Sequence, residues 1–293
     1  MRTPISTPNP GVILILAASI LWGTTGTTQA LAPSGAEPQA IGAARLAVGG
    51  TALLVYALSR GSLKGDWLKI NTLIAGASMA AYQPFFFAGV ARTGVAVGTI
   101  VALGSAPILA GMISFLAGGE RPGRRWAFAT ALAVLGCSLL VASGTSMQVD
   151  PLGLLLALGA GASYAAFAVA TKGLLEHKPP EAVMAVVFCL GAVLLLPTLL
   201  KADLSWLRQA RGLGVVLHLG LVTVALAYSL FARGLRHVPV STAATLTLME
   251  PLTAGLLGVF LLGERLTPLG LVGVLLIFSG LALLSIGKPV RNA

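Results

Sequence analysis

Ten long apolar stretches separated by short polar segments restrict the fold of this chain more than any other feature of its sequence. Each stretch is about 20 residues long, the length that a helix needs to cross about 30 Å of hydrocarbon. Strands of a membrane barrel are about ten residues long and alternate in polarity, so they do not explain the pattern. The sequence therefore predicts an all-α integral membrane protein with ten transmembrane helices. The predicted helices are 11–32, 39–58, 70–91, 95–117, 125–142, 152–171, 182–200, 212–232, 239–262 and 268–286.

The composition leaves almost nothing outside these stretches. Of 293 residues, 56% are hydrophobic and 10% are charged, with a mean hydropathy of +0.92. Soluble domains usually carry about a quarter charged residues. The longest connections, 59–69 and 201–211, are too short for an extramembrane domain.

The net charge of +10 is explained by membrane topology. With ten helices both termini lie on one side, whose loops hold thirteen Lys and Arg residues against five on the other side. Because cytoplasmic loops are enriched in Lys and Arg, we expect both termini in the cytoplasm of a multi-pass protein of the bacterial inner (plasma) membrane. The basic residues are therefore topological, and we expect no nucleic-acid partner.

An internal repeat divides the chain. GSAPILAGMISFLAGGER (104–121) aligns with LMEPLTAGLLGVFLLGER (248–265) at a shift of 144 residues, and Gly136 aligns with Gly280 at the same shift. Further upstream the shift is 142, with Gly11 opposite Gly153. We predict two homologous five-helix halves, residues 1–148 and 149–293. Because five is odd, the second half enters the membrane from the opposite face, which predicts an inverted-topology repeat and, with it, alternating access around a midplane site. The alternative is a duplication that only doubled a stable bundle.

The stretch LWGTTGTTQALAPSG (21–35) has three possible interpretations. A secretory cleavage region is disfavoured because the apolar segment is too long and Pro33 stands where cleavage would occur. A phosphate-binding loop is disfavoured because the stretch has neither GxGxxG spacing nor a lysine. On a helix, Trp22 begins one polar face while Thr24 and Thr28 form a neighbouring stripe, which predicts the wall of a transport cavity.

Other side chains at mid-span extend this predicted cavity. An indole or phenol in hydrocarbon requires a hydrogen-bonding partner, so these aromatic residues favour a polar interior over lipid; simple helix packing is the alternative. The predicted aromatic walls are Trp22, Tyr82, Phe86, Tyr164 and Tyr228. The predicted hydrogen-bonding groups are Thr24, Thr28, Gln83, Ser105 and Thr245.

Two further kinds of residue are predicted to act at the midplane. Glu250 is the one glutamate at mid-membrane, where a carboxylate accepts a proton, contacts a substrate ammonium or pairs with Arg45. Pro84, Pro107 and Pro251 lie near the midpoints of helices and predict kinks that expose backbone groups, with or without a ligand.

Other functional classes fit less well. An intramembrane enzyme needs paired carboxylates, a metal cluster or a Ser-His arrangement at depth, and the sequence has no HExxH motif and no buried Asp pair. No GxxxxGK[ST] motif supplies an ATP motor. Channels usually build their filters from several subunits, whereas a pseudo-symmetric monomer suits a carrier. We expect no enzyme activity, cofactor or metal, and a monomer, with a dimer as the alternative.

The arrangement of motifs resembles the EamA family of the drug/metabolite transporter superfamily. The resemblance rests on LWG in the first helix, Arg45 in the second, the prolines of the fourth and ninth helices and the GER after each of those two. It covers essentially the whole chain, and WGTTGTTQALAP is similar to the amino-acid exporters, including the aromatic amino-acid branch. It implies ten helices, cytoplasmic termini and efflux of small metabolites. From the depth of the polar and aromatic residues, we expect the substrate to bind between the halves, at a site lined by helices 1, 3, 4, 6, 8 and 9. We expect export of amino acids, or alternatively of purines, quaternary amines, sugar derivatives or other drugs and metabolites. One departure is that Val187 stands where Arg45 would have a counterpart in the second half.

Overall fold

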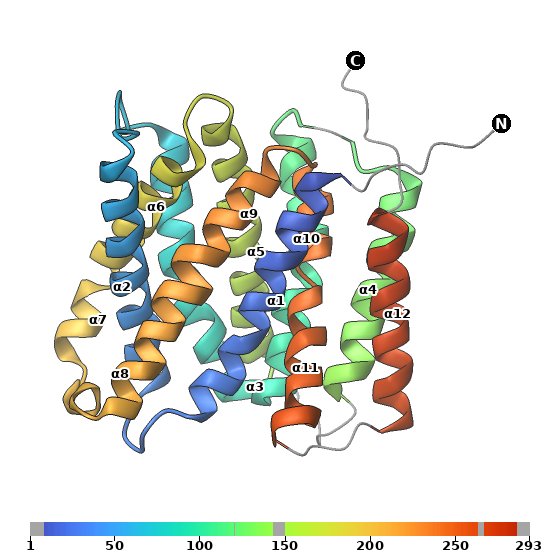
Figure 1. Cartoon of the computed structure of the whole chain (residues 1–293). Coiled ribbons are helices and arrows are strands. Elements are labelled where there is room, and N and C mark those ends of the chain that lie inside the picture. The colour runs from blue at the N-terminus through green and yellow to red at the C-terminus, as the bar shows by residue number, and fades with distance from the viewer. Residues whose placement is uncertain (1–8, 120, 143–149, 263–266, 286–293) are drawn as a thin grey trace.

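A computed structural model describes residues 9–119, 121–142, 150–262 and 267–285 (Figure 1). Every regular element in these residues is a helix, and the helices stand side by side in one bundle. The first turn of α1 and the last turn of α12 lie at the same end of the bundle (Figure 1). Eight helical segments are long and apolar enough to cross a membrane. The chain is therefore a multi-pass membrane protein.

The elements follow one another along the chain with short connections. Their bounds are α1 Pro10–Ala30, α2 Pro38–Ser59, α3 Ile70–Leu116, α4 Arg124–Ala142, α5 Pro151–Leu175, α6 Pro180–Leu194, α7 Leu196–Lys201, the 3-10 helix η1 Ser205–Arg208, α8 Ala210–Leu217, the π-helix η2 His218–Leu226, α9 Ala227–Leu235, α10 Val240–Leu246, α11 Met249–Leu262 and α12 Pro268–Ser285.

All ten predicted stretches are helical, but two of them differ from a simple span. The stretch 125–142 corresponds to α4, with 19 residues, which is not among the eight candidate spans. The stretch 182–200 is divided between α6, with 15 residues, and α7. The number of membrane crossings therefore remains a prediction, and the predicted boundary at 148/149 and the GER motifs (119–121 and 263–265) lie wholly or partly outside the described residues.

The element α3 is a helical hairpin containing two candidate spans, Ile70–Thr93 and Val97–Leu116. A Cβ atom added to Gly98 would lie 3.0 Å from the Cα of Val90, eight residues earlier. Eight residues of a straight α-helix advance about 12 Å, so the chain reverses direction between them.

The predicted prolines differ in their effect on the helices. The helix α3 continues through Pro84 and Pro107. The segment that contains Pro251 is instead divided between α10 and α11 at Thr247 and Leu248. Thr247 is four residues before Pro251, which is where a proline ring clashes with the carbonyl group of the preceding turn.

The segment between α8 and α9 also departs from regular α-helix: η2 is nine residues of π-helix. The three elements together form one candidate span, Ala210–Leu235. The sequence analysis did not predict this π-helix. Such segments are rare and often accompany functional sites.

Helix ends outside the spans are capped by side chains. The carboxylate of Asp150 accepts hydrogen bonds from the backbone amides of Leu152 (2.9 Å) and Gly153 (3.3 Å), and it forms a salt bridge with Arg92 at 3.3 Å. The hydrogen bond from Gly153 and these further contacts lower the pKa of Asp150 below its ordinary value. This capping fixes the start of α5, which carries Tyr164.

Glycines bring α4 and α12 into backbone contact. A Cβ atom added to Gly136 would lie 2.6 Å from the carbonyl oxygen of Gly273, and one added to Gly280 would lie 2.6 Å from that of Ala129. Lipid supplies no hydrophobic driving force for association, so close packing of this kind holds membrane helices together.

We expect Gly136→Ala to destabilise the protein by about 1–3 kcal/mol because α4 and α12 must separate to admit the methyl group. The measurement is thermal unfolding of the purified chain in detergent. Gly26→Ala is the matched control, since a Cβ at Gly26 meets nothing within 4 Å. Equal melting temperatures for the two variants would contradict this packing.

Candidate functional site

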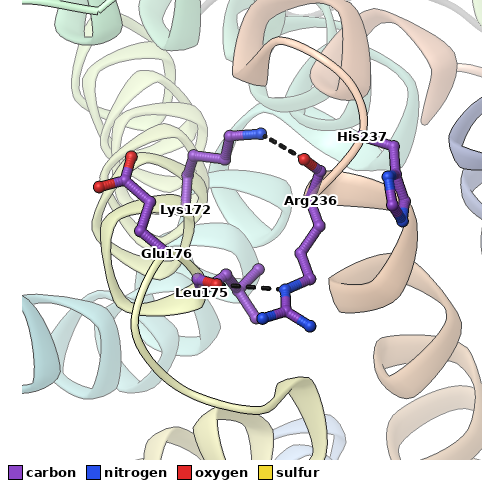
Figure 2. Close-up of a pocket in the computed structure, with 5 residues that line it drawn as sticks. All are labelled: Lys172, Leu175, Glu176, Arg236 and His237. Carbon is purple, nitrogen blue, oxygen red and sulfur yellow. Dashed lines mark hydrogen bonds between the residues drawn. The ribbon is translucent and has the colours of Figure 1, made fainter.

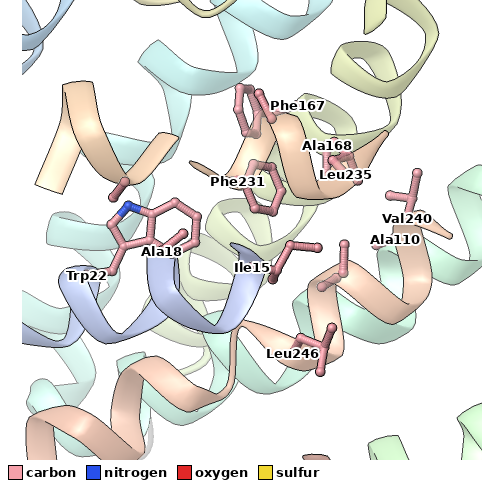
Figure 3. Close-up of a cluster of buried hydrophobic side chains, with 14 of the residues drawn as sticks. Ile15, Ala18, Trp22, Ala110, Phe167, Ala168, Phe231, Leu235, Val240 and Leu246 are labelled. Carbon is pink, nitrogen blue, oxygen red and sulfur yellow. The ribbon is translucent and has the colours of Figure 1, made fainter. Parts of the chain in front are cut away.

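Trp22 of α1 packs against the edge of an aromatic cluster that includes Phe231 of α9 (Figure 3). Its ring centroid is 4.6 Å from that of Tyr228 and 5.4 Å from that of Phe231. Trp22 itself is 6% exposed, whereas Tyr228 is half-buried. The structure thus brings two of the predicted aromatic residues into direct contact.

Two hydrogen bonds join the middle of α1 to the π-helix. The indole Nε1 of Trp22 donates to the carbonyl oxygen of Thr223 at 2.9 Å. The hydroxyl oxygen of Thr24 lies 2.9 Å from Nε2 of His218, the first residue of η2, and also donates to the carbonyl of Leu21. A movement of α1 relative to η2 would therefore have to break these hydrogen bonds.

The same cluster contains residues that the sequence analysis did not identify. Phe188 of α6 lies 4.5 Å from Tyr228, centroid to centroid, and Phe167 of α5 lies 5.8 Å from it. The predicted residue Tyr164 lies 6.4 Å from Phe231. Phe167 and Phe188 are fully buried and have no polar group, so nothing in the sequence separated them from core phenylalanines.

The phenol of Tyr164 is buried and has no hydrogen-bond partner within bonding geometry among the described residues. The hydroxyl group of Thr247, at the break between α10 and α11, is nevertheless near enough to interact with it. Thr247 was not predicted to contribute to the site.

A second aromatic group lies on α3. Tyr82 and Phe86 stack with centroids 5.6 Å apart and an interplanar angle of 10°. The neighbouring Gln83 is buried, and its Oε1 accepts a hydrogen bond from Arg45 of α2 at 3.5 Å. The predicted residues Tyr82, Gln83 and Phe86 thus lie together beside Arg45.

Glu250 lies in the first turn of α11 and packs against α1, where its backbone carbonyl oxygen would lie 2.9 Å from a Cβ atom added to Gly23. Its carboxyl group lies within electrostatic range of Tyr82, Tyr164 and Tyr228, and also of Arg45. Glu250 is half-buried, and no salt bridge joins it to Arg45 in the described part of the chain. Of the interpretations that the sequence left open, a direct Arg45–Glu250 ion pair is therefore absent from this conformation.

The remaining predicted polar residues have different surroundings. Thr245 is fully buried, and its hydroxyl contacts that of Thr130 at 2.7 Å and donates to the carbonyl of Ser241, so its partners lie within the protein. Ser105 is half-buried and donates to Ala102 at 3.3 Å. Thr28 is half-buried on α1.

A separate pocket of about 320 Å³ lies where α5 and α9 end, and none of the predicted site residues lines it (Figure 2). Lys172 donates to the carbonyl groups of Leu235 (2.6 Å), Arg236 (3.2 Å) and Val238 (3.0 Å), and Arg236 Nε donates to Leu175 at 3.1 Å. The two cations satisfy carbonyl groups at helix ends that would otherwise be left without partners.

We expect Lys172→Met to lower the free energy of unfolding by about 1–3 kcal/mol, since carbonyl groups at the end of α9 lose a charged donor. Thermal unfolding in detergent measures the change. Lys201→Met, at an exposed position in α7, is the control and should unfold like the unmodified protein. If Lys172→Met unfolds at the same temperature as the unmodified protein, these hydrogen bonds do not stabilise the fold.

A metal centre is not apparent in the described residues, which contain no group of three or more His, Cys, Asp and Glu side chains placed to hold an ion. The site is composed of aromatic rings, hydroxyl groups, one guanidinium and one carboxyl group. Groups of these kinds bind small molecules through stacking, hydrogen bonds and charge.

Comparison with known proteins identifies relatives over nearly the full length of the chain. The model of the EamA-like transporter family matches residues 9–142 and again 151–286. The chain is 47% identical over 274 residues to "Uncharacterized transporter YwfM" of Bacillus subtilis (strain 168), covering 93% of each protein. It is 30% identical over 271 residues to "Threonine/homoserine exporter RhtA" of Escherichia coli (strain K12), covering 90% of this chain and 87% of that protein. A crystal structure with 21% identity matches 94% of this chain and 98% of its own with a TM-score of 0.82, so it shares the fold.

Proposed function

Because the chain belongs to the EamA-like transporter family, we propose that it exports amino acids across the inner membrane by alternating access, as a secondary transporter. The predicted resemblance to this family is confirmed, and the family consists of transporters, not enzymes. The observation that carries the proposal is the aromatic cluster in which Trp22 of α1, Tyr164 of α5 and Tyr228 of α9 surround Phe231.

The inverted repeat is part of this proposal. The two separate matches of the family model, 9–142 and 151–286, support it. The close contacts are also reciprocal: Gly136 approaches the Gly273 carbonyl and Gly280 approaches that of Ala129, as exchange of the halves at a shift of 144 requires. Two homologous halves that exchange conformations provide the geometry for alternating access.

Other contacts support the same exchange of halves. A Cβ atom on Gly11 would lie 2.8 Å from the carbonyl oxygen of Gly234, which joins α1 to α9. A Cβ atom on Gly153, the aligned partner of Gly11, would lie 3.4 Å from the carbonyl oxygen of Gly89, which joins α5 to α3. In ten-helix numbering these are contacts of helix 1 with helix 8 and of helix 6 with helix 3.

The substrate class follows from the site and from one relative. A named threonine/homoserine exporter is 30% identical, and the site offers both a cation and an anion among aromatic rings. We propose amino acids with neutral side chains, aromatic ones included. The excess of Lys and Arg on one side supports cytoplasmic termini.

Counterflow in proteoliposomes tests this function. Purified protein is reconstituted, preloaded with an unlabelled amino acid and presented with its labelled form, with and without a pH gradient. A panel of amino acids, purines and quaternary amines identifies the class. Counterflow of purines or quaternary amines alone would replace the proposed substrate class, and a rate that responds to the gradient would indicate proton coupling.

A further inference from the structure

We infer that Arg45 and Glu250 are the two ends of a zwitterion receptor: Arg45, with Gln83, binds the carboxylate of an α-amino acid, and Glu250 binds its ammonium group. The inference rests on the proposed function and specifies how the substrate is recognised. It assigns a role to Arg45, for which the sequence suggested only an ion pair with Glu250.

Arg45 has unused hydrogen-bonding capacity in the interior of a candidate span. A guanidinium carries five N–H donors. In the described residues Arg45 makes one hydrogen bond, to Gln83, and at 3.5 Å it is at the long limit for such a contact. Its Nε is buried and has no partner among those residues. A planar carboxylate accepts two parallel N–H groups of such a fork, so this is the ligand group that fits.

Glu250 presents the complementary requirement. Glu250 lies in the first turn of α11, just after the break between α10 and α11, and it is half-buried. The described residues supply no donor to its carboxyl oxygens, and the salt bridge to Arg45 is absent although the two groups interact electrostatically. A carboxylate inside the membrane is costly unless it is paired or hydrated. A substrate ammonium group is a partner that satisfies it.

Aromatic side chains lie close to the Arg45 end: Tyr82 is next to Gln83, which accepts the hydrogen bond from Arg45, and it stacks on Phe86. Tyr82 and Tyr228 lie within electrostatic range of both Arg45 and Glu250. A ligand that carries a carboxylate and an ammonium group satisfies both ends at once and leaves its side chain against these rings. A ligand with only one charge leaves the other end unpaired, and a site built to pair a group rejects analogues that lack it.

Matched ligands and variants test the assignment of each end. The protein is the purified full-length chain in lipid nanodiscs, and the measurement is the dissociation constant. One ligand series is L-phenylalanine, phenethylamine without the carboxylate and 3-phenylpropionate without the ammonium group. The second is L-threonine, 1-amino-2-propanol and 3-hydroxybutyrate.

We expect the unmodified protein to bind an amino acid at least about tenfold more tightly than either analogue. Arg45→Gln should weaken binding of the amino acid by a similar factor without weakening that of the amine. Glu250→Gln should also weaken binding of the amino acid by about tenfold, without weakening binding of the carboxylic acid that lacks the ammonium group. Arg45→Lys keeps the charge without the fork and should retain part of the preference for the amino acid over the amine. Arg60→Gln, an exposed change just after α2, the helix that carries Arg45, is the control and should alter none of the affinities.

If a variant weakens binding of all three ligands equally, the residue has a structural role and the inference is overturned. If a variant leaves binding of the amino acid unchanged, the inference is overturned as well. In either case the proposed function survives, because amino acids still bind. Absence of amino-acid binding to the unmodified protein would overturn both. If Arg45→Gln does not fold, the Glu250→Gln and Arg45→Lys measurements decide, since each compares ligands on the same folded protein.

Discussion

Replacing Trp22 with alanine is expected to lower the free energy of unfolding by about 3–5 kcal/mol and to abolish counterflow. The indole packs against Tyr228 and Phe231 and donates to the Thr223 carbonyl of the π-helix, so its loss leaves a cavity and an unpaired carbonyl group together. Thermal unfolding and counterflow, measured on the same preparation, test the two effects. Trp22→Phe keeps a six-membered aromatic ring but removes the N–H donor and part of the indole, so it should retain more stability than Trp22→Ala.

Trp67→Ala is the matched control for the change at Trp22. Trp67 is half-buried in the connection between α2 and α3, and its Nε1 donates locally to the carbonyl of Leu63. We expect it to leave counterflow unchanged. Normal transport by Trp22→Ala would remove Trp22 from the proposed site.

Gly23→Val is expected to destabilise the protein by about 1–3 kcal/mol and to reduce counterflow strongly. A Cβ atom at Gly23 would lie 2.5 Å from the Cβ of Thr253 and 2.9 Å from the carbonyl oxygen of Glu250. A valine at this position therefore forces α1 away from the first turn of α11, which carries Glu250. Counterflow and thermal unfolding of the purified variant measure the result.

The control for this change is Gly26→Val, about one turn further along α1, where an added Cβ meets nothing within 4 Å. It introduces the same side chain into the same helix without touching α11. If the two valine variants transport equally, the contact between α1 and α11 has no part in the proposed mechanism.

Much of the fold was predictable because it depends on local properties of the chain. Apolar length and the charge of the connections predicted where helices form, and all ten stretches are helical. Pro251 predicted a break, and the helix divides four residues before it. The π-helix η2 was not predictable, because its residues are of the same types as those of an ordinary apolar helix. Its backbone geometry depends instead on the helices that pack against it.

The site was predictable in part. Depth and polarity selected Trp22, Tyr82, Tyr164 and Tyr228. The structure places Trp22, Tyr164 and Tyr228 in one aromatic cluster and Tyr82 in a second group with Phe86. The same reasoning selected Thr245, whose hydroxyl instead bonds to Thr130 of α4. Depth along a helix can be read from its residues, but the face that meets a neighbour depends on how the helix is rotated within the bundle.

The sequence by itself determined that this chain is a multi-pass membrane protein of a transporter family, because hydropathy, helix length and motif spacing are properties of consecutive residues. Only the tertiary structure decided that Trp22 binds the π-helix, that Phe167 and Phe188 complete its aromatic cluster, and that Arg45 and Glu250 lie within range without forming a salt bridge. These relations join residues far apart in the chain. They depend on the rotation and separation of packed helices, which no local pattern records.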